Sequence, residues 1–280
     1  MKPVDYPDIS ICIPVYNGAE FIRETVKSVL DQSFKNFELI ILDNASKDET
    51  SQIIQQFNDP RIKLFSNIET VSAHQNWSAV VSMASAPWTK LLCADDILVP
   101  GSLEHVHGLI QKFPDVEIFA GTRNVINEQG CEVRGNKPFS NSQIRISQSE
   151  LIDAVLKCGS NPIGESCCIT WKSELTNKTG LFSQNWKYFI DVDYWIRLAA
   201  FSDLVVTPVQ VASFRISSNS WTSNIGMKSI REAIKFFQNH ESLVRRSKIK
   251  RGFAIWRAIT RAIARKGFSF YLAMRKNRGK

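Results

Sequence analysis

Residues 9–20 read ISICIPVYNGAE, and the expected fold follows from this stretch. Its apolar run stops at Val15, just after Pro14, which is typical of a buried strand that ends at the edge of a sheet. Asn17 comes next, and Glu20 stands three residues further on. An Asn followed at that spacing by a Glu predicts a capped helix start.

The same alternation of strand and helix continues to about residue 96. A second apolar run, 37–42, ends at Asp43-Asn44, and Ser46 to Glu49 has the spacing of another helix cap. Further strands are expected at 61–65 and 88–93, and further helices around 53–57 and 77–84. Strands that alternate with helices over short links predict an α/β fold, with a mostly parallel sheet covered by helices.

Polar residues follow the predicted strands. Pro14 and Tyr16 lie at the end of the first strand, Asp43 at the end of the second, and Asp95-Asp96 after the fourth. Ligands of such sheets bind beyond the carboxyl ends of the strands. We therefore expect these residues to converge on one site.

The pattern weakens between about residues 125 and 168, where Gly, Asn, Ser and Pro are frequent. One helix is expected near 149–156, with Ser147 and Glu150 as its cap, and a clearer one opens at Asp191. There is no internal repeat and no low-complexity linker, so residues 1–225 are expected to form one domain and residues 226–280 a basic helical tail.

Composition excludes several classes of protein. Of the 280 residues, 44% are hydrophobic and 22% are charged, which is typical of a folded globular chain and excludes disorder. No apolar run approaches the roughly eighteen residues of a membrane-spanning helix, and the first residues contain no secretory signal. The six cysteines show no C-x-x-C spacing. We expect a cytoplasmic protein with reduced thiols.

The net charge of +8 is unevenly distributed. Residues 226–280 contain sixteen Lys and Arg against two Glu, which is +14, so residues 1–225 carry 8 − 14 = −6. An acidic body argues against a nucleic-acid-binding protein, which would present positive charge across its binding face.

The adjacent pair Asp95-Asp96 is the strongest chemical signal. Carboxylate oxygens suit Mg²⁺ or Mn²⁺, and such a cation neutralises a departing diphosphate. The alternative is a pair of solvated loop carboxylates. Asp43 could likewise be explained as a turn residue without a ligand role. Tyr16 could be explained as an aromatic residue at the rim of the site. No phosphate-binding P-loop and no dinucleotide fingerprint is present.

Four segments together resemble the family 2 glycosyltransferases: SICIPVYNG at 10–18, SVLDQ at 28–32, ELIILDNASKDET at 38–50 and LLCADDI at 91–97. The resemblance is strong over about the first hundred residues and looser to about residue 220. It implies the GT-A fold and an inverting transfer of sugar from a nucleoside-diphosphate sugar.

The resemblance also implies roles for individual residues. Pro14, Tyr16 and Asp43 would hold the nucleobase and ribose, and Asp95 would lie near the ribose or sugar. Asp96 would bind the Mg²⁺ or Mn²⁺ ion. Asn76 fits a stretch that forms the floor of the donor site in similar proteins, although core packing is the better explanation of its neighbour Trp77. Cys93 departs from the pattern, because many relatives have another Asp at this position.

The general base is expected on the helix that opens at Asp191. Relatives carry an acidic residue six positions before an Arg, and Asp191 has that spacing to Arg197. Asp193 is the alternative, although a carboxylate in the first turn of a helix is also explained by the helix dipole. Two positions depart from the family pattern: Ile190 replaces an acidic neighbour, and Ser217 stands where many relatives have His.

The tail contains a basic amphipathic helix. Arg257, Arg261 and Arg265 recur every fourth residue beside Phe253, Trp256, Ile259 and Ile263. Such a helix either lies on anionic lipid at a membrane surface or packs on the domain with its charges solvated.

The resulting expectation is an inverting, metal-dependent glycosyltransferase that acts on a saccharide or lipid-linked saccharide in surface polysaccharide (O-antigen type) biosynthesis. We place it in the cytoplasm, peripheral on the inner face of the membrane. The alternatives are a sugar nucleotidyltransferase, which would normally show a Gly-rich loop absent here, and a non-catalytic sugar-nucleotide-binding module.

Overall fold

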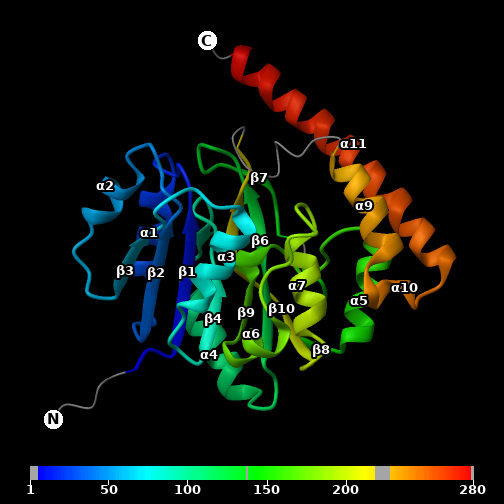
Figure 1. The fold of residues 1–280 in the computed structure, drawn as a ribbon, viewed down its shortest axis with the longest axis horizontal. Helices are drawn as coiled ribbons and strands as arrows, with labels where there is room; N and C mark the ends of the chain where they lie inside the picture. Colours follow the sequence, from blue (N-terminus) through cyan, green and yellow to red (C-terminus); the bar gives the residue numbers. More distant parts are fainter. Residues whose placement is uncertain (1–5, 137, 218–227, 279–280) are drawn as a thin grey trace.

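The protein is described by a computed structural model that covers residues 6–136, 138–217 and 228–278, with side chains described as far as residue 264. Its centre is a ten-stranded sheet (Figure 1). The strands are β1 (Ile9–Val15), β2 (Phe37–Asp43), β3 (Ile62–Ser66), β4 (Trp88–Leu91), β5 (Ile97–Leu98), β6 (Ile118–Ile126), β7 (Glu132–Arg134), β8 (Ile144–Ile146), β9 (Ile169–Lys172) and β10 (Leu204–Arg215).

Helices flank this sheet, and the α/β class predicted from the sequence is confirmed. They are α1 (Ile22–Leu30), α2 (Thr50–Gln55), α3 (Ala73–Ser82), α4 (Ser102–Lys112), α5 (Gln148–Cys158), the short 3₁₀ turn η1 (Ser166–Cys168), α6 (Glu174–Thr179), α7 (Ile190–Leu198), α9 (Lys228–Asn239), α10 (Glu241–Val244) and α11 (Lys248–Arg278).

The strand order is β3-β2-β1-β4-β9-β6-β10-β5. Strand β1 pairs in parallel with β2 on one side and with β4 on the other. Strands β2 and β3 are therefore added on one side of β1 and β4 on the other, so the strand order reverses at β1. The register sets Val15 opposite Asp43, which brings the carboxyl ends of β1 and β2 level. A crevice at such a reversal point is the usual ligand site of an open α/β sheet.

Strand β9 is the main departure from a parallel sheet. It lies antiparallel between β4 and β6, and it is reached only after the irregular middle segment. Because its four residues have no clear alternation, the sequence analysis did not predict it.

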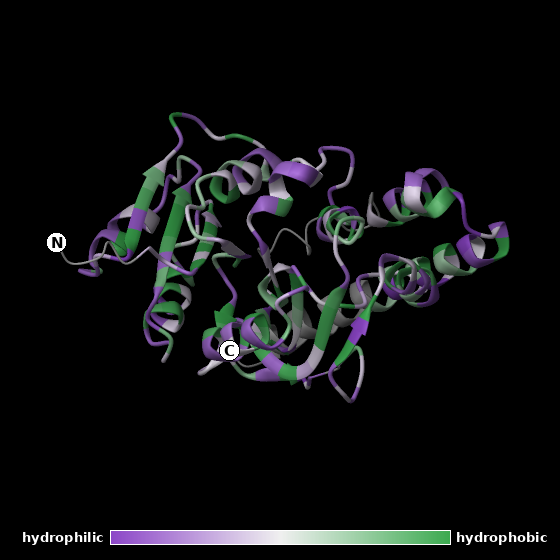
Figure 2. Cartoon of the chain, turned by 90° about the horizontal axis from the view of Figure 1, so that it is seen from below, coloured by the Kyte–Doolittle hydropathy of each residue, from purple (hydrophilic) through white to green (hydrophobic). Residues whose placement is uncertain are grey.

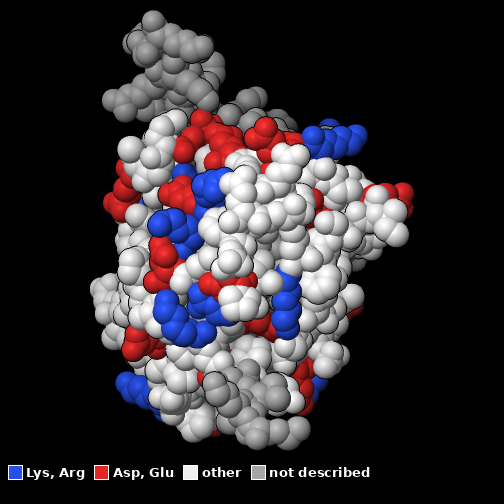
Figure 3. All heavy atoms as spheres, turned by 90° about the vertical axis from the view of Figure 1, so that its left-hand side faces the viewer, with Lys and Arg blue, Asp and Glu red and all other residues white. Residues whose placement is uncertain are grey.

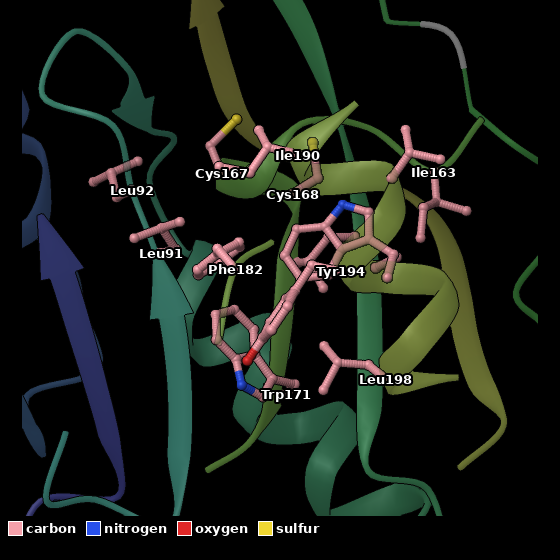
Figure 4. Packing of buried hydrophobic residues seen from close by; sticks show 14 of the residues in the cluster. Leu91, Leu92, Ile163, Cys167, Cys168, Trp171, Phe182, Ile190, Tyr194 and Leu198 are labelled. Carbon is pink, nitrogen blue, oxygen red and sulfur yellow. The ribbon is translucent and has the colours of Figure 1, made fainter. Parts of the chain in front are cut away.

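The core lies between the sheet and the helices. All seven residues of β1 and all seven of β2 are buried. Figure 4 shows the aromatic part of this core, where Phe182 stacks on Tyr194 with ring centroids 4.1 Å apart and Trp171 packs against the same tyrosine. Figure 2 shows hydrophobic strands in the middle of the molecule, with more hydrophilic loops and helix surfaces around them.

Two predicted helix caps are wrong. Helix α1 begins at Ile22 and α2 at Thr50, and neither has a side-chain cap. Asn17 and Ser46 instead join their two loops: Asn17 Oδ1 accepts from the Lys47 N–H at 2.8 Å, and the Asn17 N–H donates to Ser46 Oγ at 2.8 Å. The cap at Ser147 is confirmed, and α3 has a further capping box, Ser72 with Gln75.

The C-terminal helices share the main core. Ala233, Phe236 and Phe237 of α9 are at most 2% exposed and belong to the same buried cluster as β1 and β2. Helix α11 packs on α9 and α5 along one side of the molecule, and its far end projects away from the sheet (Figure 1). The predicted boundary at residue 225 lies outside the described residues. We propose that α9 to α11 are part of the catalytic unit.

Candidate active site

A large cleft opens beyond the carboxyl ends of β1 and β4. Its volume is about 2180 Å³, whereas a site for one small molecule is typically about 300–1,000 Å³. The cleft is therefore large enough for two substrates. The predicted residues that line it are Pro14, Tyr16, Asn76, Asp95, Asp96 and Asp191.

The loop after β1 forms one rim of the cleft. Tyr16 is 49% exposed, so the face of its ring is available for stacking on a flat ligand. Asn17 has a positive φ of 49°, a conformation that Asn tolerates better than most residues. The bonds between Asn17 and the 46–47 loop hold this rim against the end of β2.

Asp43 lies just behind the cleft surface. It is 4% exposed and does not line the cleft, whereas its neighbour Asn44 does. Ser46 donates its N–H and its hydroxyl to Asp43 Oδ1. Asn44 Oδ1 accepts from the Val71 N–H at 2.9 Å. Asp43 was predicted at this edge from the sequence, whereas Asn44 was not.

Asn76 is held on the same side of the cleft. Its Oδ1 accepts from Asn67 Nδ2 at 3.0 Å, and Asn67 Nδ2 also reaches Asn44 Oδ1 at 2.8 Å. Trp77 lines the cleft and also packs edge-on against Phe182, with ring centroids 5.4 Å apart. These amides therefore form a polar floor that is fixed by its own hydrogen bonds.

Asp95 and Asp96 are brought together with Cys93 in the loop after β4. One ligand atom of each residue lies within 4.8 Å of the others. Asp96 is fully buried, and burial together with the adjacent Asp95 charge raises its pKa well above the usual value for Asp. Burial also raises the pKa of Asp95, and the positive charge of Arg215 partly offsets this rise. Two carboxylates held in this way are poorly stabilised as anions without a cation.

The second oxygen of Asp96 supports a cation site. Asp96 Oδ1 accepts from the Arg215 N–H at 3.0 Å, while the buried Oδ2 has no partner within the described residues. Carboxylate oxygens are the ligands that Mg²⁺ and Mn²⁺ prefer, so the donor set fits a hard divalent cation. The Cys93 thiol does not fit such a cation, because burial raises its pKa and favours the protonated form.

Arg215, at the end of β10, fixes this loop. Its side chain is 1% exposed, and its Nε donates to the Asp95 carbonyl at 2.9 Å. The other guanidinium nitrogens reach the carbonyls of Asn127 and Glu128 and the carboxylate of Glu24. Arg215 therefore holds the pair through the Asp95 carbonyl and the Asp96 side chain.

Asp191 faces the same cleft from the first turn of α7. Its Oδ2 accepts from Asn161 Nδ2 at 2.8 Å, and its Oδ1 from the Val192 N–H at 2.7 Å. Burial, and secondly the charge of Glu165, raise the pKa of Asp191 to about 7 despite these bonds. Glu165 itself forms a bidentate pair with Arg123. A carboxylate with this pKa is suited to take a proton near neutral pH.

Comparison with known proteins identifies the family. The model of the family described as "Glycosyl transferase family 2" matches residues 10–170. The chain belongs to this family. An uncharacterised glycosyltransferase of Rickettsia prowazekii is 27% identical over 231 residues, which is 81% of this chain and 69% of that protein. An Escherichia coli protein is 26% identical over 220 residues, 77% of this chain and 80% of that one. It is named UDP-Glc:alpha-D-GlcNAc-diphosphoundecaprenol beta-1,3-glucosyltransferase.

Solved structures show the same fold. Staphylococcus aureus TarS (residues 1–349, with UDP) superposes with a TM-score of 0.64 at 15% identity, covering 92% of this chain and 72% of TarS. The mannosyltransferase PcManGT of Pyrobaculum calidifontis, in complex with GDP-Man and Mn²⁺, has a TM-score of 0.63 at 16% identity, covering 97% of this chain and 82% of that one. The protein is thus a family 2 glycosyltransferase with the GT-A fold.

In this glycosyltransferase, Asp193 has a different environment from Asp191. It is 3% exposed and does not line the cleft. Its Oδ2 pairs with Arg197 at 2.8 Å, and its Oδ1 lies 3.2 Å from His240 Nε2. Both oxygens are therefore engaged, one with Arg197 on α7 itself and the other with His240, which directly follows α9. This environment favours Asp191 over Asp193 as the candidate base.

Helix α9 supports the glycosyltransferase site through contacts that were not predicted from the sequence. Glu232 accepts from the N–H groups of Tyr188 and Phe189 at 2.6 and 3.0 Å, directly before the turn that carries Asp191. Phe236 stacks on Phe189 with ring centroids 4.5 Å apart. No local pattern signals these contacts, because the partners are more than forty residues apart.

Proposed function

We propose that this family 2 glycosyltransferase is an inverting, metal-dependent enzyme that transfers a sugar from a nucleoside-diphosphate sugar to an acceptor hydroxyl. One observation carries the proposal: Asp191, whose pKa is raised to about 7, faces the same cleft as the buried Asp95-Asp96 pair. A proton acceptor and a site for a charged leaving group are thereby combined in one space.

The donor is proposed to bind at the β1 and β2 edge. The Tyr16 ring is exposed for stacking on the nucleobase, and Pro14 shapes the strand end beside it. Asp43 would reach the base or ribose through Oδ2, the oxygen that Ser46 does not hold. Asn76 belongs to the amide floor of this region, and Asp95 would lie by the ribose or sugar.

Asp96 is proposed to hold a Mg²⁺ or Mn²⁺ ion through its unpartnered Oδ2, with Asp95 beside it. When bound, such a cation offsets the negative charge of the diphosphate. Arg215 keeps the loop in place for this purpose, because it binds the Asp95 carbonyl and its N–H orients Asp96.

Asp191 is proposed to act as the general base. It takes the proton of the acceptor hydroxyl as that oxygen attacks the anomeric carbon, and the bond from this carbon to the diphosphate oxygen breaks. Attack from the side opposite the leaving group inverts the anomeric centre. Asn161 orients the Asp191 carboxylate through its bond to Oδ2.

The acceptor is proposed to be a saccharide carried on a lipid, in surface polysaccharide assembly of the O-antigen type. The E. coli relative supports this, because its name states that it transfers to a sugar on diphosphoundecaprenol. We place the reaction in the cytoplasm at the inner face of the membrane.

The proposal is tested with a panel of nucleotide sugars, offered with a lipid-linked acceptor in the presence and absence of Mn²⁺. We expect transfer that needs the cation, and a product whose anomeric configuration, measured by NMR coupling, is opposite to that of the donor. Asp191→Asn should lower kcat by roughly 10²–10⁴-fold with donor affinity unchanged.

Asp153→Asn is the matched control, because this carboxylate lies on the exposed side of α5 and pairs only with Lys250 among the described partners. Near-normal turnover of Asp191→Asn would refute the assignment of the base. Donor binding without transfer or hydrolysis from any donor would instead favour a non-catalytic module.

A further inference from the structure

Helix α11 presents an exposed apolar stripe, whose last member, Ile263, reaches the rim of the cleft. Its members are spaced by three, four or seven residues, so they share one side of the helix. They are Ile249, Phe253, Trp256 and Ile263, which are 84%, 47%, 57% and 61% exposed. The opposite side of α11 is buried, with Ala254 at 0% and Ala258 at 5%. Large apolar groups aligned on a surface usually mark an interaction site.

Positive charge accompanies this stripe. Residues 245–264 include seven Lys or Arg and no Asp or Glu. The Arg257 guanidinium carbon lies 4.7 Å from the centroid of the Phe253 ring, so a positive charge contacts the apolar stripe. The opposite side of the molecule is different: Figure 3 shows basic and acidic groups interspersed over the β3 side, with acidic groups gathered toward the top. A basic, aromatic helix on an otherwise acidic chain is complementary to an anionic partner.

The position of α11 connects this surface to the active site. Arg257 and Arg261 line the cleft that contains Asp191. Helix α5 ends at Gly159 in the left-handed conformation, and a Cβ there would meet the Ala254 carbonyl at 2.6 Å. Two residues later, Asn161 binds Asp191. Helix α11 is thus packed tightly against the segment that holds the base, and one flank of it forms the wall of the cleft.

We propose that α11 docks on an anionic lipid membrane as an interfacial helix, with its apolar stripe inserted between the headgroups and its basic residues on the phosphates. Within the described residues, no helix is long and apolar enough to cross a bilayer. A helix with separate apolar and basic faces lies in the plane of the interface instead. Docked in this way, α11 sets the mouth of the cleft at the membrane surface. The inference goes beyond the proposed transfer reaction, and its test does not require activity.

The test is flotation of the full chain with vesicles of phosphatidylglycerol and phosphatidylethanolamine, compared with vesicles of phosphatidylcholine alone. We expect binding to the anionic vesicles only, weakened by salt. The double variant Phe253→Ser/Trp256→Ser should bind at least roughly tenfold more weakly, because it removes two aromatic groups that would insert into the interface. Both side chains are exposed in the protein, so its melting temperature and its affinity for nucleotide sugars should not change.

The matched control is Ile68→Ser/Phe201→Ser, which removes two apolar side chains that are 104% and 50% exposed on other segments. It should float as the wild type does. The proposal is overturned if the wild type does not bind anionic vesicles, if it binds neutral vesicles equally well, or if the α11 variant floats normally. It is also overturned if the wild type is a dimer in solution that the α11 variant dissociates, because a second copy would then cover the stripe.

Discussion

Asp191, the proposed general base, has surroundings that change the chemistry of its carboxylate. Burial, and secondly the charge of the nearby Glu165, raise its pKa to about 7. Arg123 binds both oxygens of Glu165, so this carboxylate is held in an ion pair beside Asp191. The hydrogen bonds from Asn161 and Val192 hold the Asp191 carboxylate without lowering its pKa to the ordinary range for Asp.

This predicts the pH dependence of the reaction. The base acts only when it is deprotonated, so kcat/KM should rise about tenfold per pH unit below the pKa of Asp191. It should level off above about pH 7, the pKa of Asp191. The profile is measured with saturating cation, and Asp153→Asn should keep it. A profile that is flat from pH 5 to pH 8, or one that falls toward high pH, would contradict the assignment.

Single residues differed in how far the sequence could predict them. Asp95 and Asp96 were expected at the site because acidic residues at strand ends have a recognisable pattern, and Asp191 because of the resemblance to family 2 glycosyltransferases; all three line one cleft. Arg215 and Asn161 were not assigned to the site. Each acts through a partner remote in sequence: Arg215 binds the carbonyl of Asp95, 120 positions away, and Asn161 binds Asp191. Asp191 lines the cleft and Asp193 does not, which favours Asp191 where spacing alone had left both open.

At the level of elements, the base depends on contacts between α7 and α9. The N–H groups of Tyr188 and Phe189 lie before α7, where a helix leaves donors without partners. Glu232 of α9 accepts from both of them. This contact holds the chain just before Asp191, and we propose that Glu232 is a positioning residue of the site.

Glu232→Ala should therefore lower kcat by roughly tenfold and leave donor affinity unchanged. Stability should fall by about 1–3 kcal/mol, because two N–H groups lose their acceptor. Glu232→Gln retains an acceptor oxygen and should restore most of the rate. Glu241→Ala, an exposed substitution in the next helix, is the control. An unchanged kcat in Glu232→Ala would show that α9 does not position the base.

Elements were predicted best where apolar runs are closed by polar residues, as at Val15 and Asp43. Helix starts were less certain. Asn17 and Ser46 are residue types that often cap helices, but here their polar groups form hydrogen bonds between the loop after β1 and the loop after β2. A cap and a loop-to-loop bond use the same donor and acceptor chemistry, so only the tertiary structure distinguishes them.

At the level of the whole molecule, the C-terminal helices are the part that composition described least well. Their charge predicted a separate basic tail, yet Phe236, Phe237 and Leu243 are fully buried in the main core. The antiparallel β9 was missed for a similar reason, because its place between β4 and β6 is set by packing and not by its own four residues.

A chain that ends at residue 225 should therefore fail to fold. Burial of each Phe or Leu side chain stabilises a protein by about 1.5–3 kcal/mol, and total stabilities are only about 5–15 kcal/mol. We expect aggregation, or a soluble form without near-ultraviolet circular dichroism and without a cooperative melting transition. A cooperatively folded 1–225 fragment that binds nucleotide sugars would contradict this.

The bond from Glu232 to the segment before Asp191 also has a consequence for biosynthesis. While the ribosome is still adding residues beyond Asp191, the nascent polypeptide already contains every carboxylate of the cleft but not the helix that aligns the base. Competence for transfer should thus be acquired only late in translation, once α9 has emerged from the exit tunnel and docked.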